Sequence, residues 1–298
     1  MTARACDGKV AFVAGASQFG TGTGTVVRLA AEGAKVAYCA RDEMKMRETA
    51  DEVEAVGGTC MYWRCDLSDP AGGRDTLIAR TEEAFGPIDY LVYVAAGGGY
   101  APFEDITDAM LQTGLELNVK APWVLCQQAI TSMRRRGVGG AIVAVGTKAA
   151  KSFDGPPFLQ IPPQQRGTLY GGTKAALHRF VHGLAAEFYD DRISANVIWP
   201  LAAIGTPQLL ASGWIPPELM EPPETMVEAI VACLTADPQE LTGYDGTSIE
   251  LLTRLRRPVH DWAGSELVDG WQHEDLVAYI EARRTPAVVS IMPTNAGE

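Results

Sequence analysis

The chain has 298 residues, of which 47% are hydrophobic and 21% charged, and its formal net charge is −12. This composition is typical of a globular protein that buries a sizeable core, and the acidic balance argues against a nucleic-acid-binding face, which needs clustered cations. The sequence has no run of about 18 apolar residues and no apolar signal segment near its start, so we expect neither a membrane span nor secretion. Six cysteines without a CxxC pair then predict reduced thiols in a cytoplasmic protein.

Short apolar runs alternate with amphipathic stretches along most of the chain. Strands are expected at residues 9–14, 35–40, 59–65, 88–94, 141–145, 193–199 and 247–252. Helices are expected at residues 25–33, 43–56, 70–85, 108–135 with a bend near Pro122, 169–189 and 224–235. This alternation predicts an α/β fold, namely a single doubly wound parallel sheet with helices on both faces and right-handed crossovers.

The predicted sheet occupies residues 1–254 as one domain, and residues 255–298 fit no further strand–helix unit. We expect this C-terminal extension to pack on the domain or on a neighbouring subunit, with a cap over a substrate as the alternative. Basic clusters at Arg134–Arg136 and Arg254–Arg257 are interpreted as helix ends rather than anion sites.

Two histidines have the spacing of a zinc-binding helix. His178 and His182 lie four residues apart, but Arg179 stands where such a helix carries its general-base glutamate, and no third ligand is evident. We therefore expect a packed helix and no metal.

A glycine-rich turn lies between the first strand and the first helix, and it reads Gly15-Ala-Ser-Gln-Phe-Gly20-Thr-Gly22-Thr-Gly24. Glycines allow a tight turn whose backbone N–H groups approach a pyrophosphate, and the following helix adds its positive N-terminus. In this context the turn predicts a dinucleotide site, with a loose structural turn as the alternative.

The end of the second strand decides between NAD(H) and NADP(H). An acidic residue there would bind the ribose hydroxyls of NAD(H), but this chain has Arg41, whose guanidinium can hold a 2′-phosphate. NADP(H) is therefore favoured over NAD(H), with a surface ion pair of Arg41 to Asp42 or Glu43 as the alternative. Asp66 and Leu67 follow the third strand, where they would meet the adenine; a helix N-cap is the other role open to Asp66.

Tyr170-Gly-Gly-Thr-Lys174 begins a predicted helix, so that Tyr170 and Lys174 lie one turn apart on one face. A free tyrosine has a pKa of about 10. A neighbouring ammonium group and an oxidised nicotinamide ring stabilise tyrosinate and lower that pKa. The phenol can then exchange the hydroxyl proton of an alcohol while a hydride leaves or joins the adjacent carbon.

Over about residues 8–252 the chain resembles the short-chain dehydrogenase/reductase family, in the branch with a Gly-rich turn and Tyr-x-x-x-Lys. The resemblance implies a Rossmann fold and an oxidoreductase that interconverts a ketone or aldehyde with an alcohol. Tyr170 would be the general acid/base and Lys174 would bind the nicotinamide ribose. Asn118, in Leu117-Asn-Val-Lys120, would hold a water that links Lys174 to solvent.

The resemblance also implies the cofactor contacts and the partners. The contacts fall on Gly15, Ser17, Gln18, Gly20, Thr21, Gly22, Arg41, Asp66, Leu67, Ala95, Ala96, Tyr170, Lys174, Pro200 and Thr206. The substrate would be a small-molecule carbonyl or alcohol. Members are commonly homodimers or homotetramers, with the helix that begins near Tyr170 as the expected interface.

Four features depart from the family pattern. The glycine turn has one extra residue, for which we expect a slightly larger loop and retained binding. Tyr93-Val-Ala-Ala96 replaces Asn-Asn-Ala-Gly, so we expect the polar bracing of the central sheet to be lost. Thr147 takes the place of the catalytic serine, with Ser152 as an alternative hydroxyl. The spacing from Thr147 to Tyr170 is about ten residues longer than usual.

The longer spacing places a proline-rich segment, residues 151–168, beside the predicted site. We interpret it as a wall for an apolar or bulky substrate, with a surface excursion or a subunit contact as alternatives. The departures also leave a second function open, a nicotinamide-binding sensor or scaffold without turnover. A lyase related to the halohydrin dehalogenases is disfavoured, because those replace the lysine with arginine and lose the nucleotide turn.

Overall fold

A computed structural model describes residues 4–16, 19–152, 155–158, 166–213 and 215–284. In this part of the chain seven strands form one sheet, with bounds β1 Val10–Ala14, β2 Lys35–Ala40, β3 Thr59–Arg64, β4 Tyr90–Tyr93, β5 Gly140–Val145, β6 Ile193–Trp199 and β7 Asp245–Thr247. All neighbouring pairs are parallel, in the order β3-β2-β1-β4-β5-β6-β7. The doubly wound parallel sheet predicted from the sequence is confirmed.

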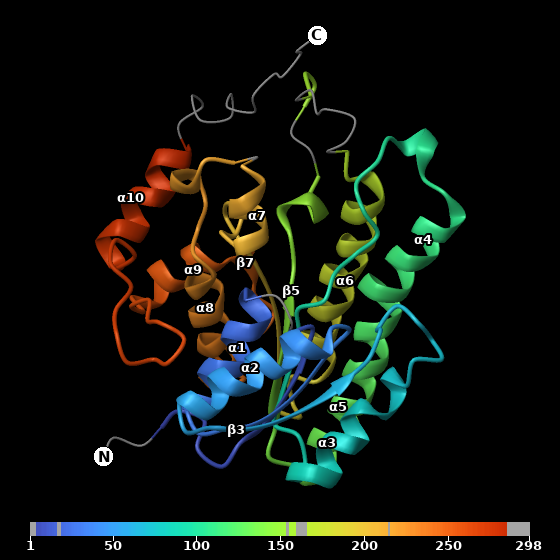
Figure 1. Cartoon of the computed structure of the whole chain (residues 1–298), viewed down its shortest axis with the longest axis vertical. Helices are drawn as coiled ribbons and strands as arrows, with labels where there is room; N and C mark the ends of the chain where they lie inside the picture. Colours follow the sequence, from blue (N-terminus) through green and yellow to red (C-terminus); the bar gives the residue numbers. More distant parts are fainter. Residues whose placement is uncertain (1–3, 17–18, 153–154, 159–165, 214, 285–298) are drawn as a thin grey trace.

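Helices cover both faces of the sheet (Figure 1). Their bounds are α1 Thr21–Ala31, α2 Glu43–Ala55, α3 Leu77–Phe85, α4 Asp108–Leu115, α5 Ala121–Arg136, α6 Thr168–Glu187, α7 Pro207–Ser212, α8 Pro223–Thr235, α9 Ser248–Leu255 and α10 His273–Arg284. Alternate residues of β1 enter two separate cores: Ala11 and Val13 pack with α1 and α8, and Phe12 packs with α5 and α6. Continuous apolar runs are therefore needed in the central strands, because neither face meets water.

The last predicted strand, 247–252, is wrong for most of its length. β7 ends at Thr247, and the rest of that run belongs to α9. Thr247 caps this helix by accepting a hydrogen bond from Glu250 N at 3.1 Å, while its hydroxyl lies 2.7 Å from the Glu250 carboxylate. This Thr-x-x-Glu capping arrangement starts a helix, and it overrides the β-like apolar run that follows.

The single long helix predicted at 108–135 is two helices joined by a π-helical turn, Glu116–Lys120. Pro122 lies in the first turn of α5 and has no N–H to donate to the Asn118 carbonyl four residues earlier, so regular α-helical bonding is interrupted there. The predicted helix 70–85 also begins later, as a 3₁₀ turn and then α3, because Gly73 adopts φ +81° just before it.

The C-terminal extension, described as far as residue 284, packs on the domain. Val259 and Leu276 are fully buried in the core shared with α1 and α8. Arg257, which was interpreted as part of a helix end, instead turns inward and pairs with the buried Glu228. Arg134–Arg136 do form the last turn of α5, and each pairs with a carboxylate of a neighbouring element. In the described part of the chain, no helix has the length and apolar character that crossing a membrane requires.

Candidate active site

A cavity of about 300 Å³ opens where the strand order reverses, between β1 and β4. Such switch points at the carboxyl ends of parallel strands are where doubly wound sheets bind ligands. Its lining includes ten of the predicted cofactor contacts: Gly15, Gly20, Thr21, Gly22, Arg41, Asp66, Leu67, Ala95, Ala96 and Thr206. Tyr170, Lys174 and Pro200 are not part of that lining. Ser17 and Gln18 lie outside the described residues.

The glycines of the turn are required by close backbone approach. Gly15 has φ +101°, and a Cβ there would lie 2.8 Å from Ala95 N. A Cβ at Gly22 would lie 2.0 Å from the Gly15 carbonyl oxygen. α1 begins immediately after Gly20, whose position caps the helix without a side-chain hydrogen bond. The first backbone N–H groups of α1 therefore have no capping side chain, and the residues that carry them line the cavity. Uncapped N–H groups at a helix N-terminus can bind the oxygens of a pyrophosphate.

Arg41 and Asp66 line the cavity from the segments that follow the neighbouring strands β2 and β3. Burial raises the pKa of Asp66, but hydrogen bonds from Ser68 and the charge of Arg41 lower it to a net value below 3.8. Ser68 N donates to Asp66 Oδ1 at 2.9 Å, so Asp66 has a local turn role as well as a place on the cavity wall. Asp42, one candidate partner of Arg41, caps α2 by accepting from Lys45 N.

Tyr170 and Thr147 come together from different elements. Tyr170 lies in the first turn of α6, and Thr147 follows β5. The Thr147 hydroxyl lies close enough to the Tyr170 phenol to lower its pKa, and the Tyr170 ring packs on Tyr100 with centroids 5.2 Å apart. Burial raises the pKa of Tyr170 well above its usual 10, Tyr100 raises it further, and Thr147 lowers it. The phenol is therefore protonated at neutral pH in the protein alone, poised to donate a proton.

Lys174 is completely buried one helical turn after Tyr170. Its side chain is 1% exposed, and Nζ donates to the Val145 carbonyl oxygen at 2.8 Å. Val145 is the last residue of β5, two positions before Thr147, so the ammonium group points toward the same strand end. Burial lowers the pKa of Lys174 from 10.5 to about 7.

We expect the pH dependence of unfolding to expose the cost of burying this ammonium group. The unfolded chain keeps a Lys174 pKa of 10.5 and the folded chain one of about 7, so between these values the unfolded chain binds more protons. Wild-type stability relative to a Lys174→Met variant, which cannot titrate, should therefore rise as pH increases across this window. Thermal unfolding of both apoproteins at about pH 6, 8 and 10 measures it, and a pH-independent difference would contradict the assignment.

Asn118 joins the loop after β4 to α6. Its side-chain nitrogen donates to the Gly97 carbonyl at 2.6 Å and to Thr173 Oγ1 at 2.9 Å, and its oxygen accepts from Gly97 N. Thr173 immediately precedes Lys174. Lys174, Thr147 and Tyr170 thus lie at the end of β5, and Asn118 contacts Thr173, the residue before Lys174.

The expected loss of sheet bracing at Tyr93–Ala96 is wrong. Tyr93 is fully buried, and its hydroxyl donates to the Leu117 carbonyl at 2.5 Å. A longer side chain from β4 therefore reaches the π-helical turn directly. Sequence reasoning missed this bond because it considered only the polar side chains that are absent.

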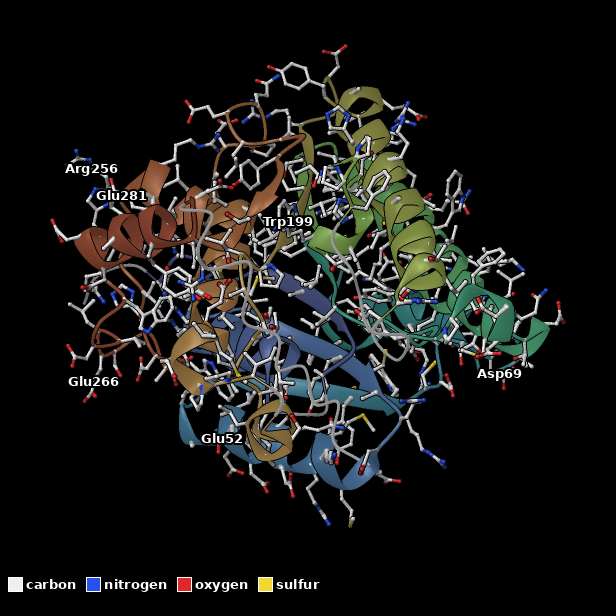
Figure 2. The ribbon with its side chains drawn as sticks, turned by 90° about the horizontal axis from the view of Figure 1, so that it is seen from above. Glu52, Asp69, Trp199, Arg256, Glu266 and Glu281 are labelled. Atoms are coloured by element: carbon white, nitrogen blue, oxygen red, sulfur yellow. The ribbon has the colours of Figure 1, made fainter. Side chains whose placement is uncertain are left out.

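Sequence reasoning also missed a chain of contacts behind Thr147. His178 Nε2 accepts a hydrogen bond from Thr147 N at 3.2 Å, and its Nδ1 lies 3.0 Å from Asp245 Oδ1. Trp199 Nε1 also donates to Asp245 Oδ1, at 3.1 Å. Figure 2 shows Trp199 near the centre of the molecule seen from above. Burial raises the pKa of Asp245, but His178 and Lys151 lower it to a net value of about 2. The i, i+4 spacing of Lys174 and His178 is a signal that both face the sheet.

In the segment after β6, Thr206 lines the cavity, and a buried carboxylate holds the segment in place. Thr206 caps α7 by accepting from Leu209 N. Glu221 is fully buried and accepts a hydrogen bond from Ala202 N at 2.7 Å, and burial raises its pKa. Pro200 lies at the end of β6, outside the cavity lining. Among the described residues, no group of three or more His, Cys, Asp or Glu could hold a metal.

The family model described as short chain dehydrogenase matches residues 9–208. An uncharacterized oxidoreductase of Thermotoga maritima is 31% identical over 193 residues, which cover 65% of this chain and 71% of that protein. A hydroxynaphthalene reductase-like protein of Metarhizium majus is 29% identical, covering 72% and 74%.

Solved structures agree with these relatives. A short-chain dehydrogenase/reductase from Serratia marcescens superposes with a TM-score of 0.69 at 25% identity, over 81% of this chain and 96% of that one. A 7α-hydroxysteroid dehydrogenase in complex with NADH and 7-oxo glycochenodeoxycholic acid superposes with a TM-score of 0.71 at 26% identity, over 83% and 95%.

Proposed function

Because this chain belongs to the short-chain dehydrogenase/reductase family, whose members are NAD(P)-dependent oxidoreductases of CH–OH and C=O groups, we propose that it interconverts a ketone or aldehyde with an alcohol, using NADP(H). The observation that carries the proposal is the meeting of Tyr170, Thr147 and Lys174 at one strand end, beside the cavity of the glycine turn. A nicotinamide cofactor bound in that cavity would supply or accept the hydride.

The proposed chemistry of the chain itself is proton transfer at Tyr170 Oη. In the reducing direction the phenol donates its proton to the nascent alkoxide oxygen, and in the oxidising direction it accepts the alcohol proton. The Thr147 hydroxyl, which lies near the Tyr170 phenol, would hold the substrate oxygen in line with that transfer. Charging Lys174 favours tyrosinate, so the ammonium group assists the oxidising direction.

Asn118 is proposed to support proton exchange between Lys174 and solvent. Its side chain is committed to Gly97 and Thr173, so it holds the π-helical turn at a fixed distance from α6. A water bound by the free backbone carbonyl group of the π-helical turn would then lie beside Lys174. This role depends on the interruption of α-helical bonding that Pro122 causes.

Arg41 is proposed to select NADP(H) by pairing with the 2′-phosphate, and we expect an Arg41→Ala variant to lose this preference. Hydrogen bonds to charged groups contribute about 1.5–3 kcal/mol, so kcat/KM for NADPH should fall roughly tenfold to a hundredfold. The value for NADH should stay within about twofold, because its adenine ribose carries no 2′-phosphate. Initial rates with both cofactors measure this, and equal losses for the two would contradict the selection role.

The substrate is proposed to be bulky and apolar. Tyr100, which is 52% exposed, packs on Tyr170 and lies next to Gly167, and Arg166 O accepts from Ala101 N at 3.0 Å. The end of segment 151–168 is thus joined to the loop after β4 at the mouth of the site. The hydroxynaphthalene and steroid names of two similar proteins support a polycyclic ketone as the first compound to test.

A homodimer or homotetramer is proposed to form through α5 and α6. A hollow of about 1120 Å³ lies between these helices, and Trp123 on its wall is 49% exposed and packs on Phe180. An apolar hollow of this kind fits the matching face of a second copy. Sedimentation equilibrium of the purified chain tests this, and a monomer would contradict it.

We also propose a cytoplasmic location, which the six free thiols support.

The decisive experiment is turnover by the purified chain. We expect NADPH oxidation, followed by nicotinamide absorbance, with at least one member of a panel of aromatic and alicyclic ketones, and alcohol formed in equal amount. Tight NADPH binding without turnover across the panel would favour the alternative, a sensor or scaffold of the same fold. Absence of nicotinamide binding would contradict both.

A further inference from the structure

The C-terminal extension contacts the glycine-rich turn through one aromatic pair. Trp262 stacks on Phe19, the residue before Gly20, with ring centroids 6.5 Å apart and planes 20° apart. The indole also lies against the start of α1, because a Cβ at Gly24 would meet Trp262 Nε1 at 2.7 Å. The ring therefore contacts Phe19 and Gly24, the residues on either side in sequence of the stretch from Gly20 to Thr23 that lines the cavity.

Phe19 needs such support. Its φ of +36° is in the left-handed region, which a bulky side chain rarely adopts. Conformations of this kind persist only where the surrounding structure holds them. The indole of Trp262 supplies a flat apolar face at this point, so that the position of the Phe19 ring and the path of the backbone into Gly20 depend on the extension.

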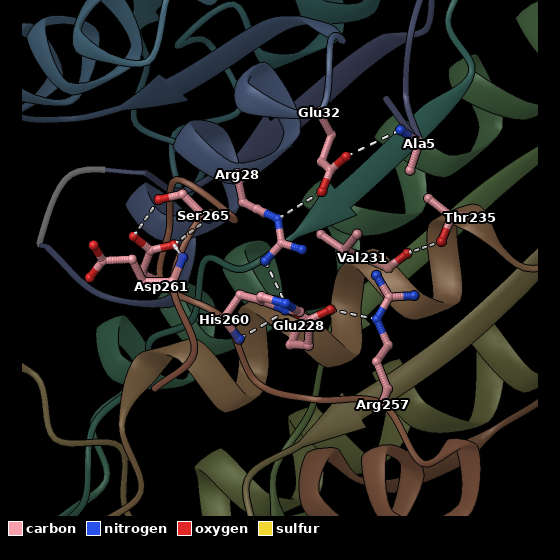
Figure 3. Close-up of polar contacts among 11 residues, drawn as sticks. Ala5, Arg28, Glu32, Glu228, Val231, Thr235, Arg257, His260, Asp261 and Ser265 are labelled. Carbon is pink, nitrogen blue, oxygen red and sulfur yellow. Dashed lines mark hydrogen bonds and ion pairs between the residues drawn. The ribbon is translucent and has the colours of Figure 1, made fainter. Parts of the chain in front are cut away.

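The segment that carries Trp262 is itself fixed to the domain by a buried charge cluster (Figure 3). Glu228 of α8 is 1% exposed and accepts from Arg28 of α1 at 2.8 Å and from Arg257 at 2.5 Å. His260 Nδ1 lies 3.2 Å from the same carboxylate. Since Arg257 and His260 belong to the extension and Arg28 to α1, one carboxylate joins the extension to the helix that begins at the glycine turn.

A second anchor is the turn around Trp262, from Asp261 to Glu266. The Asp261 carboxylate accepts hydrogen bonds from Ser265 N at 2.8 Å and from Glu266 N at 3.2 Å (Figure 3). Gly264, with φ +70°, lets this turn lie against the Arg28 guanidinium, where a Cβ would be 2.8 Å from Nε. The chain before Trp262 is thus held at Glu228 of α8, and the chain after it lies against Arg28 of α1.

We propose that Trp262 is a positioning residue of the cofactor site: the extension holds Phe19, and through it the N–H groups of the glycine turn, in the geometry that binds the cofactor pyrophosphate. Trp262 does not line the cavity and acts only through Phe19 and α1. The inference rests on the proposed function, since it presupposes a nicotinamide dinucleotide in the cavity.

The test compares cofactor affinity with turnover in a Trp262→Leu variant. We expect the Kd for NADPH, measured by calorimetry, to rise about tenfold, while kcat at saturating NADPH stays within about twofold. A Phe19→Leu variant should raise the Kd similarly. The double variant should be no worse than about twofold beyond either single one, because both changes remove the same contact.

Trp271→Leu is the matched control. Trp271 also belongs to the extension, but its ring packs on Tyr279, with centroids 4.9 Å apart, whereas the ring of Trp262 packs on Phe19 of the turn. The Trp271→Leu substitution should lower the melting temperature of the protein without changing its Kd for NADPH. The proposal is overturned if Trp262→Leu binds NADPH like wild type or if Trp271→Leu weakens NADPH binding equally. It is also overturned if the increases in Kd caused by Trp262→Leu and by Phe19→Leu multiply in the double variant. If the wild-type chain binds no nicotinamide cofactor, the proposed function fails first, and that outcome is distinct from all three.

Discussion

A Tyr170→Phe variant is expected to lose about a thousandfold in kcat while binding NADPH with wild-type affinity. The substitution removes only the phenolic oxygen, which is the atom that would carry the proton to or from the substrate. The ring would still pack on Tyr100, so the local structure should persist. Steady-state rates with the best ketone of the panel, together with calorimetric Kd values for NADPH, separate the chemical step from binding.

Tyr100→Phe provides the control for this prediction. Tyr100 lies against Tyr170 and loses the same atom in the substitution, but we assign its hydroxyl no part in the proton transfer. Its kcat should stay within about threefold of wild type. Turnover that survives in Tyr170→Phe and is lost in Tyr100→Phe would show that the wrong phenol has been assigned.

The elements that position the site could be predicted because their signals are local. The run from Val10 to Ala14, followed by glycines, identifies a buried strand and a turn by composition alone. Tyr170 and Lys174 share a helix, so their relative placement follows from four residues of spacing. The α9 helix could also have been predicted, since Thr247 and Glu250 have the spacing of a capping box.

Other parts of the site depend on contacts between residues distant in sequence. Nothing in the local sequence at Tyr93 indicates that its hydroxyl reaches the Leu117 carbonyl. The contact between His178 and Asp245 joins positions 67 residues apart in the sequence. The lowered pKa of Lys174 is a consequence of burial, which is fixed only when β5 and α6 pack. Such features follow from the assembled fold and not from any short window of residues.

The charge cluster at Glu228 illustrates the same point and has the largest expected effect on stability. Arg28 lies 200 residues before Glu228, and Arg257 and His260 lie 29 and 32 residues after it, so no local sequence pattern joins them to this carboxylate. In the structure Glu228 is 1% exposed and Arg28 3%, so both charges have lost their water. Burial raises the pKa of Glu228, but Arg28 and Arg257 outweigh it and hold the net pKa below 4.5.

The free energy of unfolding of a Glu228→Gln variant should therefore be about 3 kcal/mol lower than that of wild type, because the buried Arg28 guanidinium keeps only Glu32 as a counter-charge and the partly buried Arg257 loses its carboxylate partner. Urea unfolding at neutral pH measures this. Asp191→Asn is the control, since Asp191 pairs with Arg134 at the surface, and it should cost no more than about 1 kcal/mol.

The pH dependence of the free energy of unfolding provides a second, independent test of the Glu228 cluster. The folded pKa of Glu228 lies below its unfolded value of 4.5, so its contribution is complete above about pH 4.5 and is lost as pH falls through the folded pKa. Glutamine has no such titration. The stability difference between wild type and Glu228→Gln should thus stay constant from neutral pH down to about 4.5 and shrink below it. A difference that instead grew on acidification would mean that the carboxyl group is protonated in the folded protein, and the two guanidinium groups would then need another source of compensation.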